Sequence, residues 1–154
     1  MNMKLKFLVT AITILIISSC GKNNYKTNPQ FKIKSLNGNV IPLGSTVVVS
    51  LEVTDKEGDM SEGQFIYYPT LLNKRRLAVN IPNYIPITEP IPKFPDNSKS
   101  EIELRVPRTA LYKDINSRPG EDKNDTISIR IVVADRAGNK SDTSVTEPII
   151  LLGQ

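Results

Sequence analysis

The chain of 154 residues has a one-domain length, with an ordinary apolar fraction of 39% and a formal net charge of +4. Its 20 basic and 16 acidic residues are dispersed and form no basic stripe, so we expect no nucleic-acid partner. It contains no histidine and a single cysteine, which removes the commonest general base and zinc ligand and excludes an internal disulfide.

The first 21 residues have the layout of a bacterial export signal. Lys4 and Lys6 form a short positive region, and residues 7–17 form an apolar run that is shorter than the roughly 20 residues of a transmembrane helix. The segment Ile17-Ser18-Ser19-Cys20-Gly21 follows directly and resembles the lipobox of bacterial lipoproteins. The open alternative is an ordinary secretory signal in which the cysteine stands by chance.

The lipobox resemblance implies cleavage between Ser19 and Cys20 and lipidation of the Cys20 thiol, which would then anchor the protein in a membrane. Residues 1–19 are then the cleaved signal peptide, and residues 20–29 are the lipidated cysteine and a flexible tether. Lys22 stands after Gly21 in place of the aspartate that retains some lipoproteins at the inner membrane, which favours the outer membrane. The tether lacks the acidic run of surface-exported lipoproteins, so a periplasm-facing domain is favoured over a surface-exposed one.

Residues 30–154 alternate apolar and polar side chains with a period of two, as in a sheet with one face on a core. Val47, Val49, Leu51 and Val53 share one face of such a strand. Residues 109–115 favour at most a short helical turn. We predict a single antiparallel, all-β sandwich of about seven strands, at 31–35, 46–54, 64–72, 76–81, 100–106, 126–134 and 143–151. A small barrel or jelly roll is the alternative fold.

Two turns resemble those of bacterial immunoglobulin-like (Ig-like) and fibronectin-III-like modules. The segment from Ile129 to Ser141 contains the pattern A-D-x-x-G-N-x-S, and the segment from Val53 to Asp59 contains V-x-D-x-E-G-D. The resemblance implies an Ig-like sandwich over most of residues 30–152. The chain lacks the Cys–Trp–Cys core and the tyrosine corner of antibody-type domains, which it therefore does not match.

An acidic loop is the best candidate for a metal site. Asp55, Glu57 and Asp59 follow the second predicted strand, and in an Ig-like topology Asp135 reaches the same pole. Calcium takes 6–8 oxygen ligands, which such a cluster can supply, although the loop lacks the glycine and glutamate of an EF-hand. The alternative is that these residues are present because tight turns use Asp, Asn and Gly.

A proline-rich stretch is the candidate for partner binding. Proline cannot donate to a β-ladder, so residues 81–95 are predicted to form an edge or an extended surface segment. Together the prolines and rings form a possible partner surface, made of Pro82, Tyr84, Pro86, Pro90 and Phe94. The favoured alternative is that the same prolines protect the edge against unwanted strand pairing.

No motif for catalysis is present: the sequence has no histidine, no Gly-x-Ser-x-Gly elbow and no glycine-rich phosphate loop. We therefore expect a non-enzymatic interaction or structural module that binds another envelope protein, for instance by strand addition. The alternatives are a glycan-binding or calcium-binding accessory domain and, less favoured, a small metal-dependent enzyme. A glycan site would need three or more exposed rings on one face, chosen from Tyr67, Tyr68, Tyr84, Phe94 and Tyr112.

Overall fold

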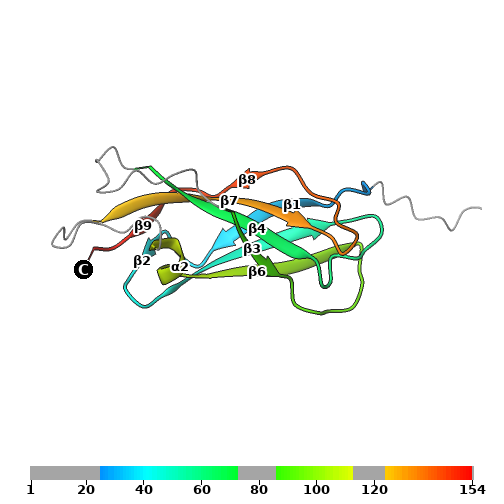
Figure 1. The fold of residues 1–154 in the computed structure, drawn as a ribbon, viewed down its shortest axis with the longest axis horizontal. Helices are drawn as coiled ribbons and strands as arrows, with labels where there is room; N and C mark the ends of the chain where they lie inside the picture. Colours follow the sequence, from blue (N-terminus) through cyan, green and yellow to red (C-terminus); the bar gives the residue numbers. More distant parts are fainter. Residues whose placement is uncertain (1–24, 73–85, 113–123, 154) are drawn as a thin grey trace, which may run out of the picture.

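The computed structural model describes residues 25–72, 86–112 and 124–153, which form two β-sheets packed face to face (Figure 1). The chain is thus a β-sandwich, as its alternating pattern predicts. The predicted signal peptide, the lipobox with Ser19 and Cys20, and the predicted strand 76–81 lie outside the described residues. Within the described ranges, no helix is long and apolar enough to cross a membrane.

The smaller sheet has three antiparallel strands in the order β1-β3-β6. Its strands are β1 (Gln30–Leu36), β3 (Thr46–Thr54) and β6 (Lys99–Pro107). Along β3 every second residue is buried, because Val47, Val49, Leu51 and Val53 point to the core. β3 and β6 pair without interruption, whereas the pairing of β1 with β3 shifts register between Ile33 and Ser35.

The larger sheet has six strands, with β2-β9-β7-β4-β5 in order and β8 paired to β7. Its members are β2 (Val40–Ile41), β4 (Gln64–Leu71), β5 (Ile87–Pro90), β7 (Asp125–Ala134), β8 (Ser144–Val145) and β9 (Ile149–Leu151). β7 is the central strand, and the alternate isoleucines along it are completely buried. The short helix α2 (Arg108–Tyr112) directly follows β6.

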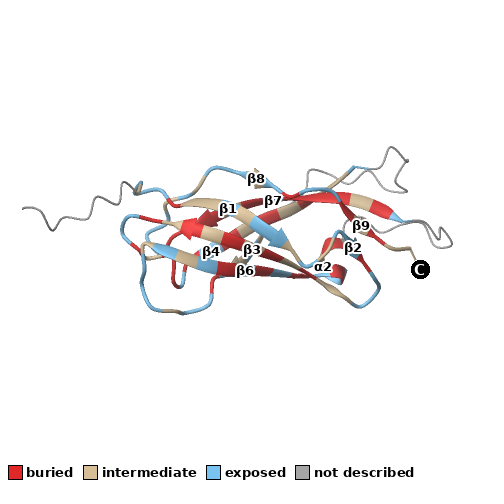
Figure 2. Cartoon of the chain, turned by 180° about the vertical axis from the view of Figure 1, so that it is seen from behind, coloured by how far each residue is buried: buried red, intermediate tan, exposed pale blue. Residues whose placement is uncertain are grey.

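One continuous apolar core fills the space between the sheets, as the buried stripes on facing strands show (Figure 2). Leu51 and Leu104 from the smaller sheet and Tyr67, Ile129 and Ile131 from the larger sheet are all fully buried. Removal of this apolar surface from water supplies the main favourable free energy of folding.

Most predicted strands agree with the structure, and two predictions need correction. The sandwich is not purely antiparallel, because β2 pairs with β9 in parallel. The predicted strand 143–151 is two strands, β8 and β9, separated by Thr146–Pro148. The proline-rich stretch supplies an edge strand, β5, which is one of the two forms predicted for it. The predicted short helical turn is present as α2.

Candidate functional site

Three aspartates from two loops meet at one end of the sandwich. Asp55 and Asp59 lie between β3 and β4, and Asp135 follows β7; these loops lie at the same end of the molecule (Figure 1). One carboxylate oxygen of each lies within 4.8 Å of the others. We call Asp55, Asp59 and Asp135 the acid pole. Glu57 has an exposed side chain and is not one of the converging groups.

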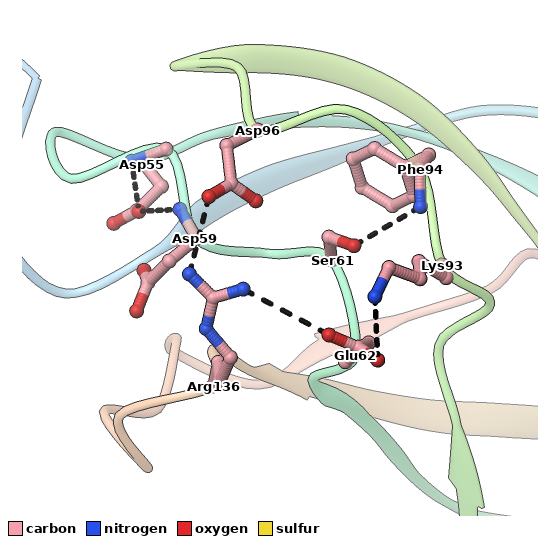
Figure 3. A network of polar contacts seen from close by, with 9 residues as sticks. Asp55, Asp59, Ser61, Glu62, Lys93, Phe94, Asp96 and Arg136 are labelled. Carbon is pink, nitrogen blue, oxygen red and sulfur yellow. Dashed lines mark hydrogen bonds and ion pairs between the residues drawn. The ribbon is translucent and has the colours of Figure 1, made fainter.

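Asp55 is positioned by a tight turn that uses its own side chain. Its Oδ2 accepts hydrogen bonds from the backbone N–H of Gly58 (2.7 Å) and of Asp59 (3.2 Å), as Figure 3 shows. Gly58 has a φ of +74°, and a Cβ there would lie only 3.0 Å from the backbone of Asn97. The turn therefore packs against the segment before β6, which leaves Asp55 with no exposed surface.

Two carboxylate oxygens of the acid pole are buried and have no hydrogen-bond partner among the described residues. Oδ1 of Asp55 and Oδ1 of Asp59 accept no hydrogen bond from any described residue. Burial raises the pKa of Asp55 above its ordinary value; the facing Asp59 carboxylate raises it further, and the turn's backbone N–H groups oppose the rise. A buried polar group without a partner is costly, so this arrangement favours a proton or a cation between the carboxylates.

Asp135 is held by a second turn. Its Oδ1 accepts from the backbone N–H of Asn139 and its Oδ2 from the Asn139 side-chain amide, both at 2.8 Å. Gly138 closes the turn with a φ of +91°. The A-D-x-x-G-N pattern thus has a local structural role, and the same turn places a buried aspartate beside Asp55 and Asp59.

Two cationic side chains near the acid pole form ion pairs with other acids. Arg136 donates from Nη2 to Asp96 (3.1 Å) and lies 3.9 Å from Glu62, which also pairs with Lys93 at 3.5 Å (Figure 3). The backbone N–H of Arg136 donates to the Asp59 carbonyl at 3.1 Å, which joins the two loops. Sequence reasoning missed this network because its members come from three separate segments of the chain.

The proline-rich candidate surface is present only in part. Pro82 and Tyr84 lie outside the described residues, and Pro86 and Pro90 are exposed at the edge strand β5. The prediction of an edge is therefore confirmed. Phe94, however, is partly buried against the core, and its backbone N–H donates to Ser61 Oγ at 3.0 Å, so its ring is only partly available to a partner.

Two of the aromatic residues considered for sugar stacking, Tyr67 and Tyr68, lie on opposite faces of strand β4. Tyr67 is completely buried, and its hydroxyl donates to Glu89. Tyr68 lies half-buried on the opposite face of β4, where the Arg130 guanidinium sits 5.7 Å from its ring centre. Tyr67 and Tyr68 therefore cannot belong to one stacking platform.

Comparison with known proteins reveals no family. No family model matches the chain, and no curated protein matches it. Among solved structures it is similar to a β-glucosidase from Listeria innocua in complex with gluconolactone, with 14% identity and a TM-score of 0.41 over 81% of this chain and 16% of that one. The chain therefore spans about one sixth of that enzyme's length.

Two smaller solved proteins show comparable similarity. One is Spo0M, a sporulation control protein from Bacillus subtilis, with 10% identity and a TM-score of 0.40 over 82% of this chain and 50% of that one. The other is a cohesin module from a Clostridium perfringens family 33 glycoside hydrolase, with 13% identity and a TM-score of 0.38 over 84% and 100% of the two chains. These identities and TM-scores are too low to carry an argument about family or function.

Proposed function

We propose that the protein is a lipoprotein of the outer membrane, anchored through Cys20 and facing the periplasm, whose sandwich is a non-catalytic module for binding another envelope protein. The lipobox Ile17-Ser18-Ser19-Cys20 supports the anchor. The absence of histidine from the sequence supports a non-catalytic role. The single observation that carries the binding role is the outer edge of strand β6, which pairs with no other strand among the described residues.

We further propose that the sandwich is of the Ig-like class, on the basis of its strand order. In Ig-like sandwiches the first, second and fifth principal strands share one sheet, and the third, sixth and seventh share the other. β1, β3 and β6 correspond to the first set, and β4, β7 and β9 to the second. β2 leaves the first sheet and joins the second, which explains its parallel pairing with β9.

The tether would hold the acid pole toward the membrane. The Lys26 carbonyl accepts a hydrogen bond from the backbone N–H of Lys56 at 3.1 Å, so the start of the described chain packs on the acidic loop. Cys20 lies six residues before Lys26, a separation of at most about 20–22 Å of extended chain. An anchored Cys20 would therefore keep the acid pole near the lipid headgroups.

β6 is the longest strand with an unpaired side in the described part of the chain. β5 has four residues and is flanked by Pro86 and Pro90, and β2 has two residues. β1 contains a register shift of the kind that disfavours edge pairing. β6, in contrast, is nine residues long and pairs regularly with β3 on one side. On its other side β6 has no partner strand among the described residues. An extended partner segment can add to such an edge through main-chain hydrogen bonds.

The anchor is tested by metabolic labelling of cells with a radioactive fatty acid. The full-length protein should incorporate label and enter the detergent phase, and Cys20→Ser should abolish both. Equal labelling of the Cys20→Ser variant would contradict lipidation at this residue.

The binding role is tested by site-specific photo-crosslinking in intact cells. A photoreactive residue at Glu101 or Glu103, both exposed on β6, should yield an adduct of defined size with one envelope protein. Thr88, exposed on the proline-flanked edge β5, is the matched control and should yield none. Adducts that are absent, or equally abundant from both edges, would contradict strand addition at β6.

A further inference from the structure

We propose that Asp55, Asp59 and Asp135 bind one calcium ion, which ties the β3–β4 loop to the β7–β8 loop. This inference depends on neither the lipid anchor nor the partner-binding edge. It depends on the geometry of the acid pole and on the unpaired oxygens found there.

The first observation is the convergence of the three carboxylates. Their ligand atoms lie within 4.8 Å of one another, although Asp135 is 76 residues beyond Asp59. Opposite ligands of a calcium ion, each at 2.3–2.6 Å, are separated by roughly 4.6–5.2 Å. One ion can therefore contact all three groups without rearrangement of either loop.

The second observation, independent of the first, is the unsatisfied Oδ1 of Asp55. Asp55 has no exposed surface, yet its Oδ1 accepts no hydrogen bond from any described residue. The Asp55 carboxylate faces that of Asp59, whose Oδ1 is also buried and accepts no hydrogen bond from a described residue (Figure 3). The other Asp55 oxygen is fully used by the turn. Turn formation thus explains one oxygen of Asp55 and leaves the other available to coordinate an ion.

The charge balance also favours a divalent cation. Three carboxylates carry three formal negative charges, whereas the Arg136 guanidinium beside Asp59 carries one positive charge and is already bonded to Asp96 and close to Glu62. Hard carboxylate oxygens suit calcium or magnesium better than softer transition metals. Calcium is the better fit, because loops of irregular geometry accommodate its variable coordination, whereas magnesium demands a near-ideal octahedron at 2.0–2.1 Å. With only three protein ligands, the dissociation constant should fall at about 10⁻⁴–10⁻³ M, as in extracellular modules.

The experiment measures thermal unfolding and calcium titration of the full-length chain purified in detergent. Calcium at about ten times the dissociation constant should raise the Tm, and calorimetry should show one saturable site per chain. Magnesium at equal concentration should give a clearly smaller rise. A folded protein with no saturable calcium binding up to about 10⁻² M, ten times the weakest affinity expected, would overturn the proposal. An equal or stronger effect of magnesium would overturn the assignment to calcium.

Variants distinguish a ligand from a purely structural turn residue. Asp59→Asn should weaken calcium affinity at least tenfold, and its Tm in EGTA should exceed that of the wild type, because one half-buried negative charge that repels Asp55 is removed. Glu57→Gln, on the same loop but exposed, is the matched control and should behave as the wild type in both conditions. Unchanged calcium affinity in Asp59→Asn, or a lower Tm of that variant in EGTA, would overturn the proposal.

Discussion

The hydroxyl of Tyr67 on β4 donates a 2.6 Å hydrogen bond to Oε1 of Glu89 on β5, and this bond joins the sandwich interior to its edge. Tyr67 is completely buried, so its ionised form would lie in an apolar environment next to a carboxylate. Burial, and then the Glu89 carboxylate, raises the pKa of the Tyr67 phenol well above its ordinary value. The protein should therefore lose stability at alkaline pH.

The sign follows from the protonation states. The unfolded chain releases the Tyr67 proton near pH 10, whereas the folded chain retains it, so stability is fully present below pH 10 and falls as the pH rises above it. Between about pH 10 and 12 the Tm of Tyr67→Phe should fall less steeply than that of the wild type. Tyr68→Phe, which changes the half-buried neighbour on the opposite face, should keep the wild-type slope. Parallel slopes for all three proteins would contradict this account.

Gly63 lies where β4 begins, in close contact with the strand that leads to Asp135. A Cβ at this position would overlap the Ala134 carbonyl oxygen and lie 3.2 Å from Asp135 Cα. Because the obstruction is backbone and cannot rotate away, Gly63→Ala should cost about 3 kcal/mol of unfolding free energy, the upper part of the range for overpacking. Urea denaturation measures this cost.

Gly44→Ala is the control for a simple glycine effect. Gly44 has a φ of +72°, and a Cβ added there would have no neighbouring atom within 4 Å, so only backbone strain of about 1–2 kcal/mol is expected. A Gly63→Ala cost no larger than that of Gly44→Ala would show that the loops at the acid pole shift easily.

Glu62 is the one non-glycine residue with a positive φ, 64°, in the part of the chain that the structure describes. Its carboxylate lies near Lys93 and Arg136, but such exposed ion pairs contribute little stability. Glu62→Gly should therefore be more stable than Glu62→Ala by about 1 kcal/mol, since both lose the carboxylate and only glycine relieves the backbone strain. Chemical denaturation of the two variants checks this. An alanine variant at least as stable as the glycine variant would contradict it.

The alternation of apolar and polar residues predicts the long strands well. β3, β6 and β7 lie within one residue of their predicted bounds, because each has a continuous apolar face toward the core. β2 could not be found this way, since two residues carry no period. Its parallel partner β9 lies more than 100 residues later in the chain.

The sequence predicts which aspartates form the acid pole, but it does not predict that Asp55 is buried there. Aspartates in D-x-E-G-D and A-D-x-x-G-N turns are normally explained by backbone needs alone. The burial of Asp55 depends on packing of its turn against Asn97 and on a hydrogen bond from its N–H to the Ser98 carbonyl. No local pattern indicates that distant contact, and the same holds for the link between Arg136 and Asp96.

Thr146 explains why the predicted strand 143–151 divides in two, and it provides a sharp test of that explanation. Pro148 has no N–H and cannot donate to the β-ladder. At Thr146 the buried side-chain Oγ1 accepts a hydrogen bond from the Ile129 N–H at 3.0 Å. The Thr146 N–H donates to the Ile129 carbonyl, also at 3.0 Å. Thr146→Val preserves shape but leaves the Ile129 N–H unsatisfied, which should cost about 1–3 kcal/mol in urea denaturation. Thr143→Val, at an exposed position, should change stability by less than about 0.5 kcal/mol. Equal effects of the two substitutions would mean that the Thr146 hydroxyl does not replace the missing ladder bond.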